Sequence, residues 1–166
     1  MSPGFAIAAS SRAHLPEILA IYNEVIRNTT AVYSDKEVTL EDREKWFDAK
    51  GAQSFPVLVA ADSSGVVGFG TFGEFRAWPC YRASVEHSVH VRADCRRRGV
   101  GRALVVALID AAAAMQKHVM IAGIDAENVN SISLHESLGF EVVGHFREVG
   151  RKFGRWLDLK FMQRFI

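Results

Sequence analysis

The part of the sequence best suited to hold a phosphorylated ligand is a short basic run, Arg96-Arg97-Arg98-Gly99-Val100-Gly101-Arg102. Glycines let the main chain turn tightly and leave its amide groups uncovered. Amide groups at a helix N-terminus attract anions, and arginine pairs well with phosphate. Because the run lies between an expected strand and an expected helix, it favours a pyrophosphate site over a solvated basic turn.

Two titratable residues in apolar surroundings are candidates for proton transfer. Glu86 lies within the expected strand 83–92, and a carboxylate in an interior strand costs desolvation free energy unless some chemistry uses it. An edge or surface carboxylate is the alternative, and it is the commoner case. His135 lies beside Leu134 and Leu138, where a histidine is either a proton carrier or a satisfied core residue.

Other classes of site find weaker support. His87 and His90 are three residues apart on a strand, so they face opposite sides of the sheet and cannot share a metal ion. The glycines of 68–73 spell a dinucleotide-binding pattern inside an expected strand, where bulges or a close backbone approach explain them better. Cys80 and Cys95 are more simply unpaired thiols than ligands or nucleophiles. We therefore expect no metal site, and the lack of a GxxxxGK[ST] run excludes a P-loop ATPase.

The elements that position these residues follow from hydrophobic periodicity and turn chemistry. We expect strands at 5–9, 55–61, 66–75, 83–92, 118–124, 140–149 and 156–165. We expect helices from about Leu15, after a capping box at Thr39 and Asp42, and at 100–116 and 129–138. The order βααβββαβαββ predicts an α/β (α+β) fold with a mixed sheet and helices on both faces.

Composition limits the partners. Apolar residues make up 49% of the chain and charged residues 23%, which is typical of a soluble globular protein. Twenty basic and nineteen acidic residues leave a net charge of +1, so we expect neither nucleic acid nor membrane as a partner. With 166 residues, no signal peptide and no long apolar span, we expect one domain, 1–166, in the cytoplasm.

The loop and the helix at 129–138 resemble the GCN5-related N-acetyltransferase (GNAT) superfamily. Its pyrophosphate loop, [QR]-x-x-G-x-[GA], is matched by Arg96, Gly99 and Gly101. Its later signature, N-x-x-[SA]-x-x-L-[YH]-x-x-x-G-F, is matched by Asn128, Ser131, Leu134, His135, Gly139 and Phe140. From Ile21 to Gln163, the chain more narrowly resembles the phosphinothricin and methionine sulfoximine acetyltransferases, for instance in Val85-Glu86-His87-Ser88-Val89.

The resemblance implies a GNAT fold and transfer of acetyl from acetyl-CoA, a co-substrate used without metal, to a small amine. Glu86 matches the family's catalytic carboxylate, and His135 stands where the wider superfamily usually has a tyrosine acid. The pantetheine arm is expected to pair with strand amides, as a neighbouring strand would. The expected cofactor-binding residues are Val89, His90, Val91, Arg97, Arg98, Gly99, Val100, Gly101, Arg102, Asn128 and Ser137.

The resemblance also implies where the acceptor binds. Arg76 and Arg82 match the family's substrate arginines, and a guanidinium fork suits the carboxylate of an α-amino acid. The implied acceptors are methionine sulfoximine, methionine sulfone and phosphinothricin. The chain departs from the family at Pro79-Cys80, which replaces a glycine-containing segment and restricts the loop backbone. The expected substrate-binding residues are Phe75, Arg76, Pro79, Cys80, Tyr81 and Arg82.

Two alternatives remain open at this point. One is an enzyme that acetylates a protein or peptide N-terminus, and the other is a CoA-sensing module without turnover. Glu86 and His135 argue against the second, because binding alone requires neither. The resemblance further implies a homodimer with its sites near the interface.

Overall fold

The computed structural model describes residues 4–166, and its elements follow the expected order. The helices are α1 (Leu15–Asn28), α2 (Leu40–Ala52), α3 (Val100–Ala114) and α4 (Val129–Glu136). The strands are β1 (Ala6–Ala9), β2 (Val57–Asp62), β3 (Gly65–Glu74), β4 (Ser84–Val91), β5 (Val119–Asp125), β6 (Glu141–Lys152) and β7 (Arg155–Phe165). Short 3-10 turns at Arg12–His14, Pro79–Tyr81 and Ala93–Cys95 complete the order, so the predicted fold class is confirmed.

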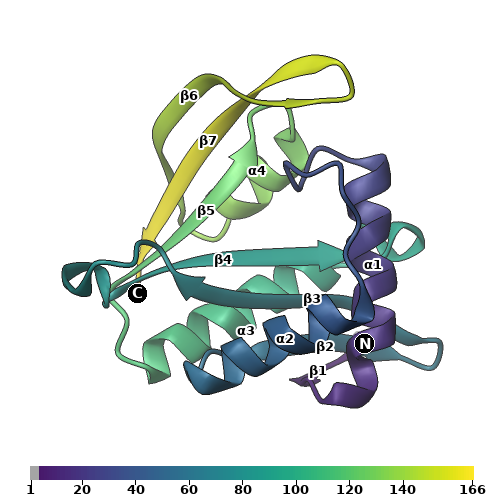
Figure 1. Cartoon of the computed structure of the whole chain (residues 1–166). Helices are drawn as coiled ribbons and strands as arrows, with labels where there is room; N and C mark the ends of the chain where they lie inside the picture. Colours follow the sequence, from purple (N-terminus) through teal and green to yellow (C-terminus); the bar gives the residue numbers. More distant parts are fainter. Residues whose placement is uncertain (1–3) are drawn as a thin grey trace.

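The strands form a mixed sheet in the order β1-β2-β3-β4-β5-β7-β6 (Figure 1). Neighbouring strands run antiparallel except β4 and β5, which pair in parallel. Parallel strands need a crossover connection, and helix α3 lies in the one between β4 and β5. The almost entirely apolar sequence of β5, VMIAGID, suits this interior position.

Helices cover both faces of the sheet, as predicted. Buried residues of α1 pack with Val59 and Phe69 on one face, where α2 joins them. On the other face, α3 packs over Phe72. A Cβ atom added to Gly70 would lie 3.1 Å from Leu108 Cδ1, so this glycine lets α3 come close to the sheet. The glycines of β3 therefore serve close packing, as the sequence indicated.

The sheet opens between β4 and β5. The two strands pair over three residues, ending at Glu86 and Ile121, although β4 continues to Val91 and β5 to Asp125. On its other edge, β4 stays paired with β3 as far as Val91. Within residues 4–166, the β4 main chain beyond Glu86 therefore has no strand neighbour on the β5 side. Figure 1 shows β5 rising away from β4 beyond this point.

Some element ends differ from the prediction by a few residues. Helix α3 ends at Ala114, because Gln116 has a left-handed φ of 54°. Helix α4 ends at Glu136. Three residues later Gly139, with a left-handed φ of 80°, turns the chain away from the helix axis. Strand β6 extends to Lys152, because it stays paired with β7 as far as the hairpin turn.

Two negative findings apply to the described part of the chain. No helix within residues 4–166 combines the length and apolar character that crossing a membrane requires. The same residues contain no group of three or more His, Cys, Asp or Glu side chains placed to hold a metal ion.

Candidate functional site

The basic loop leads directly into the N-terminus of α3. Gly99 is the N-cap residue and has a φ of 83°, a left-handed conformation that glycine adopts without strain. The first amide groups of α3 have no partner inside the helix, and among residues 4–166 no side chain caps them. Uncapped amides and the helix dipole together form an environment that attracts phosphate.

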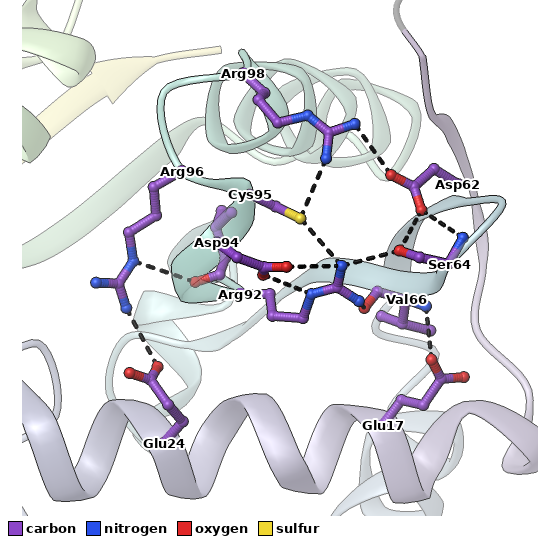
Figure 2. Close-up of polar contacts among 11 residues, drawn as sticks. Glu17, Glu24, Asp62, Ser64, Val66, Arg92, Asp94, Cys95, Arg96 and Arg98 are labelled. Atoms are coloured by element: carbon purple, nitrogen blue, oxygen red, sulfur yellow. Dashed lines mark hydrogen bonds and ion pairs between the residues drawn. The ribbon is translucent and has the colours of Figure 1, made fainter.

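Two arginines of this loop are held by other elements (Figure 2). Arg98 donates to the carboxylate of Asp62 at 3.0 Å and to the sulfur of buried Cys95 at 3.2 Å. Arg96 donates to the carboxylate of Glu24 in α1 at 3.3 Å. These contacts tie the loop to the β2–β3 turn and to α1, so we assign Arg96 and Arg98 first to shaping the loop.

The remaining loop arginines have a different setting. Arg97 is exposed and has a left-handed φ of 63°. Arg102 donates to the hydroxyl of Ser137 at 2.7 Å, which joins the start of α3 to the end of α4. Asn128 caps α4, because its side-chain oxygen accepts the Ser131 N–H at 3.1 Å. The structure thus gathers Arg102, Ser137 and the uncapped end of α3 in one region.

Glu86 occupies the last position of β4 that pairs with β5, where the sheet begins to open. Burial raises the pKa of its carboxyl group above the usual range, while the positive charge of Arg76 acts in the opposite direction. Gly123 of β5 lies alongside: a Cβ atom there would be 3.1 Å from Glu86 Oε1 and 3.3 Å from Phe161 Cε1. The glycine therefore leaves one side of the carboxylate uncovered.

Aromatic rings form a wall next to this carboxylate. The ring of Phe75 meets those of Tyr81 and Phe161, each with its centroid 6.0 Å away. The guanidinium of Arg76 lies 4.2 Å from the centroid of Phe75, which fixes the cation over the ring. A carboxylate, a guanidinium and an apolar wall are thus brought together from β4, β7 and the segment between β3 and β4.

The rest of the predicted substrate loop is placed differently. Arg82 donates to the carbonyl of Pro79 at 3.3 Å, and its own carbonyl accepts from Lys117 at 2.8 Å. Cys80 is an exposed free thiol, and Pro79 begins the short 3-10 turn. Arg76 donates to the Phe75 carbonyl at 2.9 Å and its charge acts on Glu86, whereas Arg82 is bound within its own turn.

His135 contacts a second histidine on the other face of β4. Its Nε2 lies 3.1 Å from His87 Nε2, and its Nδ1 lies 2.7 Å from the Ser131 carbonyl oxygen. Consecutive strand residues point to opposite faces, so His87 is directed away from the side of Glu86. The structure thus places the two predicted proton-transfer residues, Glu86 and His135, on opposite faces of β4.

Buried histidines make the stability of the fold sensitive to acid. Burial lowers the pKa of His87 to about 3 and that of His90 to about 4, against roughly 6.5 in the unfolded chain. Well above pH 6.5 both are neutral in either state, so they cause no pH dependence there. Below it, the unfolded chain takes up protons that the folded chain does not.

We therefore expect the free energy of unfolding to fall between pH 6.5 and 5, by up to about 1.4 kcal/mol per pH unit for each histidine. Urea unfolding at pH 7, 6 and 5 measures this slope. The His90→Gln variant should show a shallower slope than the parent. An unfolding free energy that stays constant from pH 7 to 5 would contradict the burial argument.

Sequence reasoning missed several members of this site. Gly123 lies close to both Glu86 and Phe161, and it meets Phe161 because β5 and β7 pair in this register. The alternation of Leu157, Leu159 and Phe161 indicated an apolar face on β7, but no local signal showed what it faces. The contact of His87 with His135 likewise joins residues 48 positions apart.

Comparison with known proteins identifies a matching family model and several similar proteins. A model of the acetyltransferase (GNAT) domain matches residues 7–161. The L-methionine sulfoximine/L-methionine sulfone acetyltransferase of Pseudomonas paraeruginosa is 51% identical over 152 residues, covering 91% of this chain and 88% of that protein. The crystal structure of ribosomal-protein-alanine N-acetyltransferase from Brucella melitensis has a TM-score of 0.95 and 45% identity, covering 97% of this chain and 99% of that one. The phosphinothricin acetyltransferase of Sinorhizobium meliloti in complex with AcCoA has a TM-score of 0.95 and 34% identity, covering 98% of this chain and 89% of that one.

Proposed function

This chain belongs to the acetyltransferase (GNAT) family, and we propose that it transfers acetyl from acetyl-CoA to the α-amine of a small amino-acid analogue. The acceptors we propose are methionine sulfoximine, methionine sulfone and phosphinothricin, with one domain, 1–166, performing the whole reaction. The observation that carries this proposal is the half-buried carboxylate of Glu86 at the point where the sheet opens, on which the positive charge of Arg76 acts. One group accepts a proton from the amine, and the other binds the carboxylate beside it.

The co-substrate fits the other side of the opening. The free β4 edge beyond Glu86 offers main-chain groups of Val89–Val91 to the pantetheine arm. The uncapped amides of Val100, Gly101 and Arg102 would hold the pyrophosphate, with Arg97 adding charge. Acetyl-CoA supplies a thioester that is already activated, so the proposal requires no metal.

Glu86 is the proposed proton acceptor. An ammonium group has no lone pair for attack on the thioester carbonyl, so a base must first remove a proton. The raised pKa of Glu86 makes its carboxylate a stronger base than an exposed glutamate, and the uncovered side next to Gly123 admits water or the amine. For His135 we propose a place on the cofactor side, because α4 is tied to the start of α3 through Arg102 and Ser137.

Arg76 is the proposed carboxylate ligand of the acceptor. In an α-amino acid the carboxylate is one carbon from the amine, so its partner must lie near the base. The charge of Arg76 acts on Glu86, whereas Arg82 is bound to Pro79. The rings of Phe75, Tyr81 and Phe161 are the proposed surroundings of the acceptor's side chain.

We expect Arg76→Ala to lower kcat/KM for methionine sulfoximine about ten- to a hundredfold, because one charge-assisted contact is lost. The matched variant Arg82→Ala should have a smaller effect. The measurement is thiol release from acetyl-CoA, with free amino acids, sulfones, phosphinothricin, polyamines, peptides and a decarboxylated analogue as acceptors. If Arg76→Ala shows the same ratio of kcat/KM between methionine sulfoximine and its decarboxylated analogue as the parent enzyme, this assignment is overturned.

A protein N-terminus is a second candidate acceptor, favoured by the openness of the substrate loop. Trp78 in this loop is 68% exposed, so a longer chain has room to approach. The peptide arm of the same screen decides between the two acceptors. Binding of acetyl-CoA without release of thiol to any acceptor would instead favour a CoA-sensing module.

We further propose that the protein is a homodimer and acts in the cytoplasm. Strands β6 and β7 expose large apolar side chains that a second copy of the chain would cover. These side chains are Val142, Val143, Phe146, Val149, Trp156 and Phe165. Exposed apolar area concentrated on one ribbon is typical of an interaction surface.

A further inference from the structure

We propose that His87 is a positioning residue for His135: its Nε2–H donates to the Nε2 lone pair of the neutral His135 imidazole, whose own proton is on Nδ1. No motif marks His87 for this role, and the role follows from the hydrogen bonds of the pair. The placement of the protons stands on geometry alone. Its consequence for catalysis rests on the proposed function.

The tautomer of His135 follows from the nearest polar neighbour of each of its two ring nitrogens. A carbonyl oxygen only accepts hydrogen bonds, so the 2.7 Å contact of His135 Nδ1 with the Ser131 carbonyl requires the proton on Nδ1. In a neutral imidazole the other nitrogen then carries a lone pair. At 3.1 Å from this lone pair stands His87 Nε2, which must therefore be the donor.

The remaining nitrogen of His87 agrees with this assignment. Its Nδ1 is buried, and within residues 4–166 no group forms a hydrogen bond to it. The opposite tautomer of His87 would bury an unpaired N–H and set two lone pairs 3.1 Å apart. The assigned arrangement leaves one lone pair unused and makes every N–H of the pair a donor.

The surroundings keep both rings neutral and aligned. The two ring planes are inclined by only 20° with centroids 5.1 Å apart, which suits an N–H that lies in the plane of its ring, and Phe140 meets both rings edge to face. Burial lowers the pKa of both histidines, and the positive forms of His135 and His90 lower that of His87 further. On His135, the hydrogen bond to Ser131 acts in the opposite direction. The influences on either ring include no carboxylate that would favour a cation.

The consequence concerns the proton that the sulfur gains. During acetyl transfer the ammonium group loses two protons, the sulfur gains one, and one is released to solvent. Nε2 of His135 holds a lone pair that already accepts from His87, and its only N–H is bound to Ser131. We therefore infer that the proton gained by the sulfur comes from the amine. His135 is assigned the role of holding α4 against β4.

The direct test is nitrogen-15 NMR of the labelled protein at pH 7, using long-range imidazole correlations. We expect His135 protonated at Nδ1 and His87 at Nε2, with a scalar coupling between the two Nε2 atoms across the hydrogen bond. A proton on His135 Nε2, or averaged tautomers for either ring, would overturn the proposal. The spectrum needs no substrate, so it decides the matter even if no acceptor amine is found.

Variants separate positioning from simple packing. In His87→Leu the donor to the Nε2 lone pair is lost, so we expect the titration of His135 to move to higher pH. In His87→Gln the side-chain amide still donates, so the parental titration should be retained. His90→Gln, which removes an equally buried ring on the other face of β4, should leave the His135 signals unchanged. A His87→Leu protein with the parental titration of His135 would refute the role, and if this variant does not fold, the parent spectrum decides.

Discussion

Replacing Glu86 by glutamine is expected to lower kcat about 10²–10⁴-fold, which is the usual contribution of a general base. The amide has almost the same shape but takes up no proton from the ammonium group. The base form is required for turnover, so the parent rate should fall as the pH drops through the pKa of Glu86. Burial raises this pKa, which places the acid limb above the usual range of a glutamate.

Glu74→Gln is the matched control, because Glu74 is an exposed carboxylate at the end of the neighbouring strand β3. It should turn over substrate as the parent does. Steady-state rates across pH 5–9 with saturating acetyl-CoA provide the comparison. Near-normal turnover of Glu86→Gln across pH 6–9 would show that the carboxylate is structural.

Placing a carboxylate at position 101 is expected to abolish acetyl-CoA binding. Gly101 is the second residue of α3, where the proposed pyrophosphate site lies. In Gly101→Glu, a negatively charged side chain lies at the proposed pyrophosphate site and repels the pyrophosphate of acetyl-CoA. The backbone tolerates a side chain here, because a Cβ atom would make only ordinary contacts at 3.7 Å with Leu134 and Val91. Calorimetric titration with acetyl-CoA measures the loss.

Gly101→Ala separates charge from size. It adds the same Cβ atom without the carboxylate, so we expect it to fold normally and to retain binding. Thermal unfolding of both variants shows whether the fold is intact. Unchanged affinity in a folded Gly101→Glu protein would place the pyrophosphate elsewhere.

The elements of the fold were predictable because their signals are local. The capping box at Thr39 and Asp42 begins α2 as predicted, with the Thr39 side chain accepting from the Asp42 N–H at 3.2 Å. The Asp62–Gly65 turn joins β2 to β3, and its backbone is held by the Asp62 side chain. Such hydrogen bonds span only a few residues, so residue type and spacing decide them.

The roles of the loop arginines were not predictable from type alone. All four arginines of 96–102 have the same chemistry, yet Arg98 is bound to Asp62, 36 residues away, and Arg102 to Ser137, 35 residues away. Arg76 and Arg82 were equivalent as sequence, but the charge of Arg76 acts on Glu86, while Arg82 donates to the carbonyl of Pro79. Side chains of this length reach several partners, and the packing of distant elements selects among them.

The sequence by itself determined the order of the elements and pointed to the basic loop and to Glu86 as candidate site residues, because each signal depends on neighbouring residues. Only the tertiary structure decided that Gly123 lies against Glu86 and Phe161, and that His87 meets His135 on the opposite face. Both contacts depend on where β4 separates from β5 and on how α4 packs over the sheet. Strand register and helix packing are settled by the whole core at once, because no short segment carries the energy that selects them.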